Sequence, residues 1–181
     1  MTSLDAAVGA AYLQDVVRQY RMYKGYADKA IARVADADLH TELDANSNSI
    51  AVIMKHVAGN LRSRFRDFLT ADGEKPDRNR DTEFEMPDRA SREEILRWWE
   101  EAWGILFGSI EALTPEDLGR HITIRGEQYL VIEALNRSIA HTASHVGQIV
   151  YLSRHFAGGN WTSLTIPKGA SAAFAQGQFK K

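Results

Sequence analysis

The chain has 181 residues, a formal net charge of −2 and no cysteine. Its length is typical of one domain, and its composition, 44% hydrophobic and 25% charged, excludes wholesale disorder. The nearly neutral charge gives no reason to expect nucleic acid or an anionic membrane surface as a partner. Without cysteine there can be no disulfide framework, zinc ribbon or thiolate nucleophile, so any metal must be bound by His, Asp or Glu.

The first eleven residues include Asp5 and lack both a basic stretch and an apolar core, which argues against a signal peptide. No apolar run approaches the roughly 18 residues of a membrane span. We therefore expect a cytoplasmic protein with no membrane partner.

The first expected helix covers residues 4–34, where apolar side chains recur at helical spacing. Ser49 is a suitable N-cap for a second helix, which carries apolar residues along one side and arginines along the other. Residues 72–89 contain a glycine, two prolines and many charges, and predict a long loop. A loop of this length often serves a function, although solvated surface is the simpler interpretation.

A capping box formed by Ser91 and Glu94 predicts the start of a third helix, whose tryptophans we expect in packing contacts: Trp98, Trp99 and Trp103. Thr114 before Pro115 predicts a short helical turn. Residues 121–124 alternate like a brief strand that ends at Gly126.

The last long helix is expected over residues 128–156, and the two glycines that follow would end it. Four long helices predict an all-α fold, a four-helix bundle over about residues 4–156 within a single domain, 1–181. The C-terminal tail, 157–181, is too polar for a core of its own, so it either packs on the bundle or is mobile.

His141 and His145 are four residues apart on the last predicted helix, which places both imidazoles on one face. Such a pair can chelate one metal ion, and small residues around it leave room for a partner helix. His56, on the second helix, is the candidate third ligand, which would complete a three-histidine site with an open position. The alternative is that these are buried histidines that only form hydrogen bonds.

Two known kinds of metal site are excluded by spacing. A zincin requires Glu directly after its first His, and a di-iron bundle requires Glu-x-x-His pairs, which this chain lacks. Of the other histidines, His40 and His121 fall in predicted connections, and His155 lies too far along its helix from His145 to share an ion.

With these histidines, the sequence resembles the DinB-like superfamily of metal-binding four-helix bundles, in particular an uncharacterised bacterial branch. The resemblance extends from about Tyr12 to Phe174. The strings that carry it are Ser49-Ile50-Ala51-Val52-Ile53, Lys55-His56-Val57-Ala58-Gly59-Asn60, Asp72-Gly73-Glu74-Lys75-Pro76, Arg78-Asn79-Arg80-Asp81, Ile124-Arg125-Gly126-Glu127, Asn136-Arg137-Ser138 and His145-Val146-Gly147-Gln148-Ile149.

The resemblance implies an up-down-down-up bundle, often a homodimer, with one divalent transition metal, zinc or nickel, bound by His56, His141 and His145. It also implies relatives that use low-molecular-weight thiols, namely bacillithiol transferases and mycothiol-dependent isomerases. Asp77 departs from the pattern, because we expect an aromatic residue there.

The expected mechanism is Lewis-acid activation, in which a water or thiol at the open position loses its proton and attacks an electrophile. Asn60 and Gln148 could orient the ligands or the substrate. Arg64 and Arg137 could hold an anionic substrate, although an ion pair on the helix surface is the simpler role.

The sequence therefore predicts a metal-dependent thiol transferase or hydrolase acting on a small molecule. The alternative is a non-catalytic stress protein that binds a metal or a small ligand. A third hypothesis is a structural helical dimer in which the metal is vestigial.

Overall fold

The computed structural model describes residues 3–86 and 89–175. It is mostly helical, in keeping with the predicted all-α fold. The long helices of the described chain are α1 (Ser3–Ile31), α2 (Ile50–Phe65), α3 (Arg92–Glu111) and α4 (Val131–Ala157). The shorter elements are η1 (Asp36–His40), η2 (Asp81–Phe84), η3 (Pro115–Gly119), η4 (Gly158–Asn160), α5 (Ser171–Ala175) and the strands β1 (His121–Ile124) and β2 (Glu127–Leu130).

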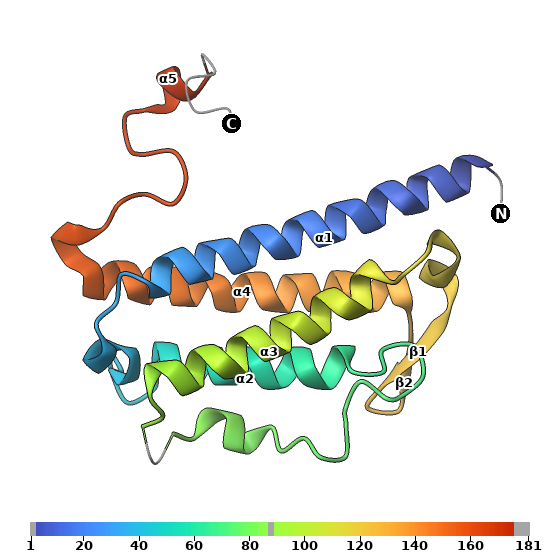
Figure 1. Cartoon of the computed structure of the whole chain (residues 1–181), viewed down its shortest axis with the longest axis horizontal. Helices are drawn as coiled ribbons and strands as arrows, with labels where there is room; N and C mark the ends of the chain where they lie inside the picture. Colours follow the sequence, from blue (N-terminus) through green and yellow to red (C-terminus); the bar gives the residue numbers. More distant parts are fainter. Residues whose placement is uncertain (1–2, 87–88, 176–181) are drawn as a thin grey trace.

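The long helices lie side by side, α1 against α4 and α2 against α3, and α2 also contacts α4 (Figure 1). Followed along the chain in Figure 1, α2 and α3 run in one direction, and α1 and α4 run in the opposite direction. The contact between α2 and α4 is the one that matters for the histidines, because it places the second and fourth long helices face to face.

Capping residues begin two of these helices where the sequence predicts. Ser49 Oγ accepts a hydrogen bond from the Val52 N–H at the start of α2. At the start of α3, Ser91 Oγ accepts from the Glu94 N–H, and the Glu94 carboxylate accepts from the Ser91 N–H at 2.9 Å. These bonds satisfy N–H groups that have no partner within a helix.

The last long helix begins at Val131, so its predicted start at residue 128 is wrong. Residues 127–130 instead form β2, which pairs antiparallel with β1 through a turn at Arg125 and Gly126. Both turn residues have positive φ, 55° and 78°, as a tight two-residue hairpin requires. The predicted strand at residues 121–124 is confirmed, and its partner was missed.

The core between α1, α2 and α3 is aromatic. Trp99 and Trp103 are fully buried, and the Trp103 ring lies 6.0 Å from that of Tyr20 in an edge-on contact. Trp99 Nε1 donates a hydrogen bond to Asp28 Oδ1 at 2.9 Å, which satisfies the polar atom of a buried indole. Trp98 is only half-buried. The prediction that these tryptophans are packing residues therefore holds most fully for Trp99 and Trp103.

The segment predicted as a long loop runs back along α2 and contains the 3-10 turn η2 (Figure 1). Lys55 holds it to the helix, because its Nζ donates to the carbonyls of Thr82 at 2.7 Å and Glu85 at 2.8 Å. The loop is thus tied to the helix that carries His56. Residues 87–88 lie outside the described residues.

The first part of the C-terminal tail contacts the turn that follows α1. The guanidinium of Arg33 lies 5.2 Å from the centre of the Trp161 ring and donates to the carbonyl of Thr162. Residues 176–181 of the predicted tail lie outside the described residues. Within the described residues, no helix combines the length and apolarity needed to cross a membrane.

Removing the N-cap of α3 tests how much this cap contributes to the stability of the protein. We expect Ser91→Ala to lower the free energy of unfolding by about 1 kcal/mol, because the Glu94 N–H loses its acceptor. Urea unfolding measures the change. Ser144→Ala, in the exposed middle of α4, is the control and should leave the value nearly unchanged. Equal stability of Ser91→Ala and the wild type would contradict the assignment.

Candidate metal centre

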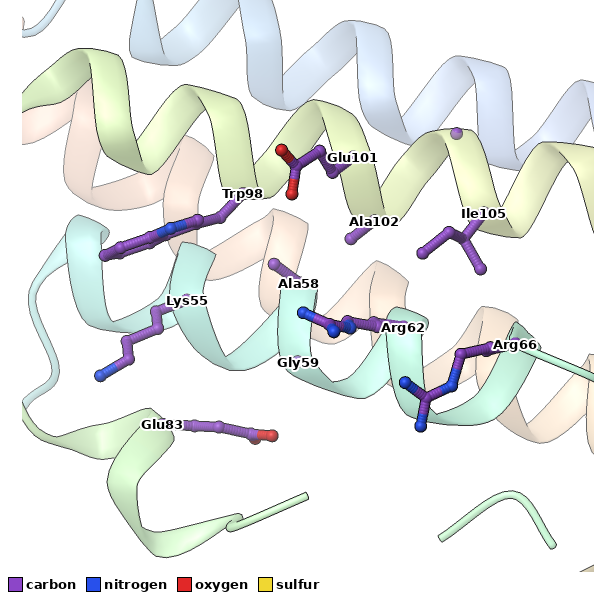
Figure 2. A pocket seen from close by; sticks show the side chains of 11 residues that line it. Lys55, Ala58, Gly59, Arg62, Arg66, Glu83, Trp98, Glu101, Ala102 and Ile105 are labelled. Carbon is purple, nitrogen blue, oxygen red and sulfur yellow. The ribbon is translucent and has the colours of Figure 1, made fainter. Parts of the chain in front are cut away.

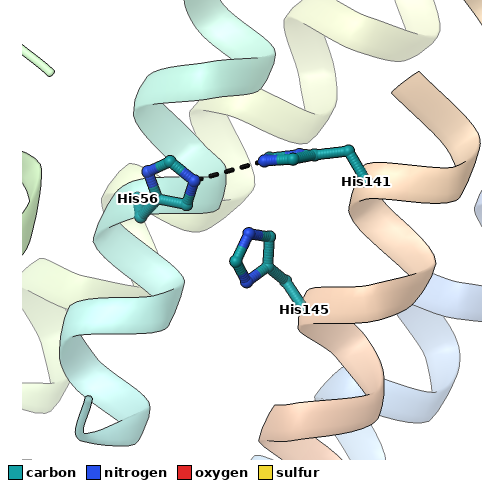
Figure 3. Close-up of side chains that lie close together, drawn as sticks. All are labelled: His56, His141 and His145. Atoms are coloured by element: carbon teal, nitrogen blue, oxygen red, sulfur yellow. Dashed lines mark hydrogen bonds between the residues drawn. The ribbon is translucent and has the colours of Figure 1, made fainter. Parts of the chain in front are cut away.

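Three imidazoles meet where α2 faces α4 (Figure 3). His56 comes from α2, and His141 and His145 come from successive turns of α4. His56 Nε2 and His141 Nε2 are 3.3 Å apart, and one ligand atom from each of the three residues lies within 4.8 Å of the others. The structure thus brings together the three histidines that the sequence predicts as a group.

Burial favours the uncharged form of His141 and His145. His56 is 3% exposed, and the other two rings are half-buried. Burial, reinforced by electrostatic repulsion from the neighbouring imidazoles and from Arg78 and Arg64, lowers the pKa of His141 to about 4. Burial also lowers the pKa of His145, against the hydrogen bond to Gln148. At neutral pH these rings are therefore in the uncharged form that can bind a metal.

A buried carboxylate that sequence reasoning missed orients His56. Glu83, in η2, has Oε2 only 2.8 Å from His56 Nδ1. Arg78 donates to both oxygens of this carboxylate, at 2.8 Å and 2.9 Å. Burial raises the pKa of Glu83, but the hydrogen bonds from His56 and Arg78 outweigh it, and the pKa is lowered. An ionised carboxylate only accepts, so His56 Nδ1 is the donor in this contact, and Nε2 is the nitrogen that faces the cluster.

Gly59 allows Glu83 to come this close. A Cβ atom on Gly59 would lie 2.3 Å from Glu83 Oε1 and 2.7 Å from its Cδ, distances that no side chain tolerates. Because Arg78 and His56 hold the carboxylate, it could give way only by losing these hydrogen bonds. The glycine one turn after His56 is therefore part of the site.

Gln148 orients His145 in a similar way. His145 Nδ1 donates to Gln148 Oε1 at 2.9 Å, which leaves Nε2 free to face the cluster. The predicted role of Gln148 in orienting a ligand requires such a contact and stays a prediction. His141 differs, because its buried Nδ1 has no hydrogen-bond partner among the described residues.

The other predicted residues lie farther along the same helices. Asn60 is buried, and its side chain makes no hydrogen bond with the described residues. Arg64 is buried too, and its guanidinium donates to the carbonyl of Gly73 and to Glu74 Oε2. It therefore forms an ion pair, but the predicted location of that pair on the helix surface is wrong. Arg137 is exposed, with its guanidinium 5.5 Å from the centre of the Tyr129 ring.

Asp77, which departs from the pattern of the resemblance, pairs with Arg66 through both carboxylate oxygens. Three histidines lie apart from the cluster, as predicted. His40 Nε2 is 3.0 Å from the carbonyl of Ala90, and His121 and His155 are exposed.

Glu83 also borders a larger, open groove of about 740 Å³ between α2 and α3 (Figure 2). Lys55, Arg62 and Trp98 line this groove, and none of the three histidines does. Glu83 therefore lines the groove and also contacts His56 of the cluster.

Comparison with protein families assigns the chain to one family. The profile of a family described as "Protein of unknown function (DUF1572)" matches residues 7–170. The chain belongs to this family. The matched range includes the three histidines and Glu83. Comparison of this DUF1572 protein with curated proteins gives no match, and neither does comparison with solved structures. Membership of the DinB-like superfamily stays a prediction.

The donor set of this DUF1572 protein fits a metal ion. Three imidazoles suit a divalent transition metal, and ligating histidines commonly donate their second N–H to a carboxylate or amide, as His56 and His145 do. Within the described residues no fourth His, Cys, Asp or Glu belongs to the cluster. The cluster could therefore hold a metal and leave part of its coordination open.

Displacing the Glu83 carboxylate should weaken metal binding. We expect Glu83→Gln and Gly59→Ala each to reduce zinc affinity by about 10- to 100-fold, because His56 loses its orienting partner. Competition with a chromophoric chelator measures this. Gly104→Ala is the matched control, since a Cβ there meets nothing within 4 Å. Wild-type affinity in both site variants would contradict the role of Glu83.

The lowered pKa of His141 predicts a pH-dependent stability of the metal-free protein. The folded state holds this pKa near 4, whereas the ordinary value is 6.5. The unfolded chain binds the proton more readily, so stability should fall as the pH drops from about 6.5 to about 4. Urea unfolding of chelator-treated protein measures this. His141→Gln should show a shallower pH dependence, and an equal one would count against the assignment.

Proposed function

We propose that this DUF1572 protein is a DinB-like, up-down-down-up four-helix bundle that binds one divalent transition metal, zinc or nickel, through His56, His141 and His145. The observation that carries the proposal is the convergence of three ligand atoms within 4.8 Å of one another across α2 and α4. The opposed directions of α1/α4 and α2/α3 in Figure 1 support the bundle topology.

The residues of the chain prepare this site for metal binding. Glu83 accepts from His56 Nδ1, and Gln148 accepts from His145 Nδ1, so the Nε2 atoms of both rings are the candidate ligand atoms. Desolvation keeps His141 uncharged at neutral pH. When bound, the metal would supply Lewis acidity, which favours loss of a proton from a water or thiol ligand.

We further propose that the protein is an enzyme that transfers a low-molecular-weight thiol to an electrophile or hydrolyses a small substrate. A cluster with three protein donors supports this over a closed structural site, because catalytic sites keep a position open. The chain contains no cysteine, so a sulfur nucleophile would have to be a separate small molecule. The alternative is a non-catalytic stress protein that binds a metal or a small ligand.

Metal content tests the first part of the proposal. Purified or reconstituted protein should contain close to one equivalent of zinc or nickel by elemental analysis. His56→Ala, His141→Ala and His145→Ala should each lose most of it, whereas His155→Ala, an exposed histidine of the same helix as two ligands, should retain it. No metal in the reconstituted wild type would contradict the site.

Thiol-transfer assays test the second part. Bacillithiol, mycothiol and glutathione should be tried against a panel of electrophiles with zinc- and nickel-loaded protein. We expect turnover with at least one thiol, and at least 100-fold slower turnover for His141→Ala, because one of three ligands is gone. Inactivity across the panel, with the metal retained, would favour the binding alternative.

A further inference from the structure

A small cavity of about 60 Å³ lies beside His141, between α2 and α4, with β1 at one side. Its polar lining consists of Asn60, Arg64, Arg137, Ser138 and His141. The cavity is distinct from the groove of Figure 2, with which it shares no residue.

The cavity continues the histidine cluster along both helices. Asn60 and Arg64 follow His56 by one and two helical turns, and Ser138 precedes His141 by about one turn. Residues at these spacings share a helix face, so the polar side chains face one another as the histidines do. A turn rises about 5.4 Å, which puts the cavity within the length of a small molecule from the cluster.

One polar group in this cavity lacks a partner. Asn60 is 9% exposed, lines the cavity, and makes no side-chain hydrogen bond within the described part of the chain. Ser138 differs, because its buried hydroxyl lies beside that of Tyr20, with which it can share a hydrogen bond. Buried amides are normally hydrogen-bonded. The Asn60 amide therefore points to a ligand that supplies the missing partner.

The charges around the cavity favour an anion. Two guanidinium groups line it, and no Asp or Glu does so. Arg64 donates to Glu74, but that carboxylate is shared with Arg78 and Arg125. Arg137 has no carboxylate partner among the described residues, and its guanidinium lies 5.5 Å from the centre of the Tyr129 ring.

We propose that this cavity binds the carboxylate of the substrate, with Arg137 and Asn60 as its donors. The inference rests on the proposed function, because a carboxylate held here places the neighbouring substrate atoms beside the histidine cluster. A planar guanidinium matches a carboxylate, and the small volume suits a group of a few atoms. The substrate class is therefore a small carboxylic acid whose reacting atom lies a few bonds from the carboxylate.

Propionate and propionamide, which share a shape and differ in charge, test this by NMR on the isotope-labelled, metal-free protein. Propionate should shift the Asn60 side-chain amide and the Arg137 Nε–H resonances saturably, and propionamide should bind at least tenfold more weakly. Arg137→Gln and Asn60→Ala should each raise the propionate dissociation constant, about tenfold for the arginine. Arg154→Gln, an exposed arginine of the same helix, should leave it unchanged.

Zinc affinity measured on the same samples separates this inference from the proposed function. Arg137→Gln should bind zinc like the wild type. If zinc binds and propionate shifts neither resonance, the carboxylate site is overturned and the metal centre stands. If inorganic phosphate binds these residues more tightly than propionate does, the carboxylate assignment is overturned. If propionate binds as expected and zinc does not, the cavity is supported and the metal centre falls.

Discussion

The hydrogen bond between the Glu83 carboxylate and His56 Nδ1 is the contact that connects the rest of the structure to the histidine cluster. Burying a carboxylate is costly unless its oxygens are hydrogen-bonded, and Arg78 meets that cost by donating to both. Arg78 also pairs with Glu74, which accepts from Arg64 of α2. The charged residues of the loop thereby fix its path along α2 and, through Glu83, the orientation of one imidazole.

Helix packing provides the other half of the site. His141 and His145 need no loop to bring them together, because four residues of helix place them on one face. His56, the third histidine of the cluster, reaches them because α2 contacts α4. The aromatic core between α1, α2 and α3 helps to hold α2 in place. The same contact aligns Asn60 with Ser138 one turn away, so one helix interface presents both a candidate metal site and a candidate substrate site.

Much of this was predictable from the sequence. Periodic apolar residues and caps identify the helices, and the spacing of His141 and His145 identifies the pair. Glu83 was not predictable, because it lies 27 residues from His56 in a segment whose mixed charges are typical of solvated surface. The burial of Arg64 was not predictable either, because a charged side chain usually lies on the surface. β2 was missed because Glu127–Leu130 lacks the alternation of a strand and leads directly into α4.

X-ray absorption spectroscopy of the zinc-loaded protein tests the central claim most directly. We predict three imidazole nitrogens at about 2.0–2.1 Å, with the multiple-scattering features of histidine, plus one or more lighter donors from outside the chain. In His141→Gln the imidazole contribution should fall from three to two. A spectrum dominated by carboxylate oxygens, or one that His141→Gln leaves unchanged, would contradict the assignment of His56, His141 and His145 as the metal ligands.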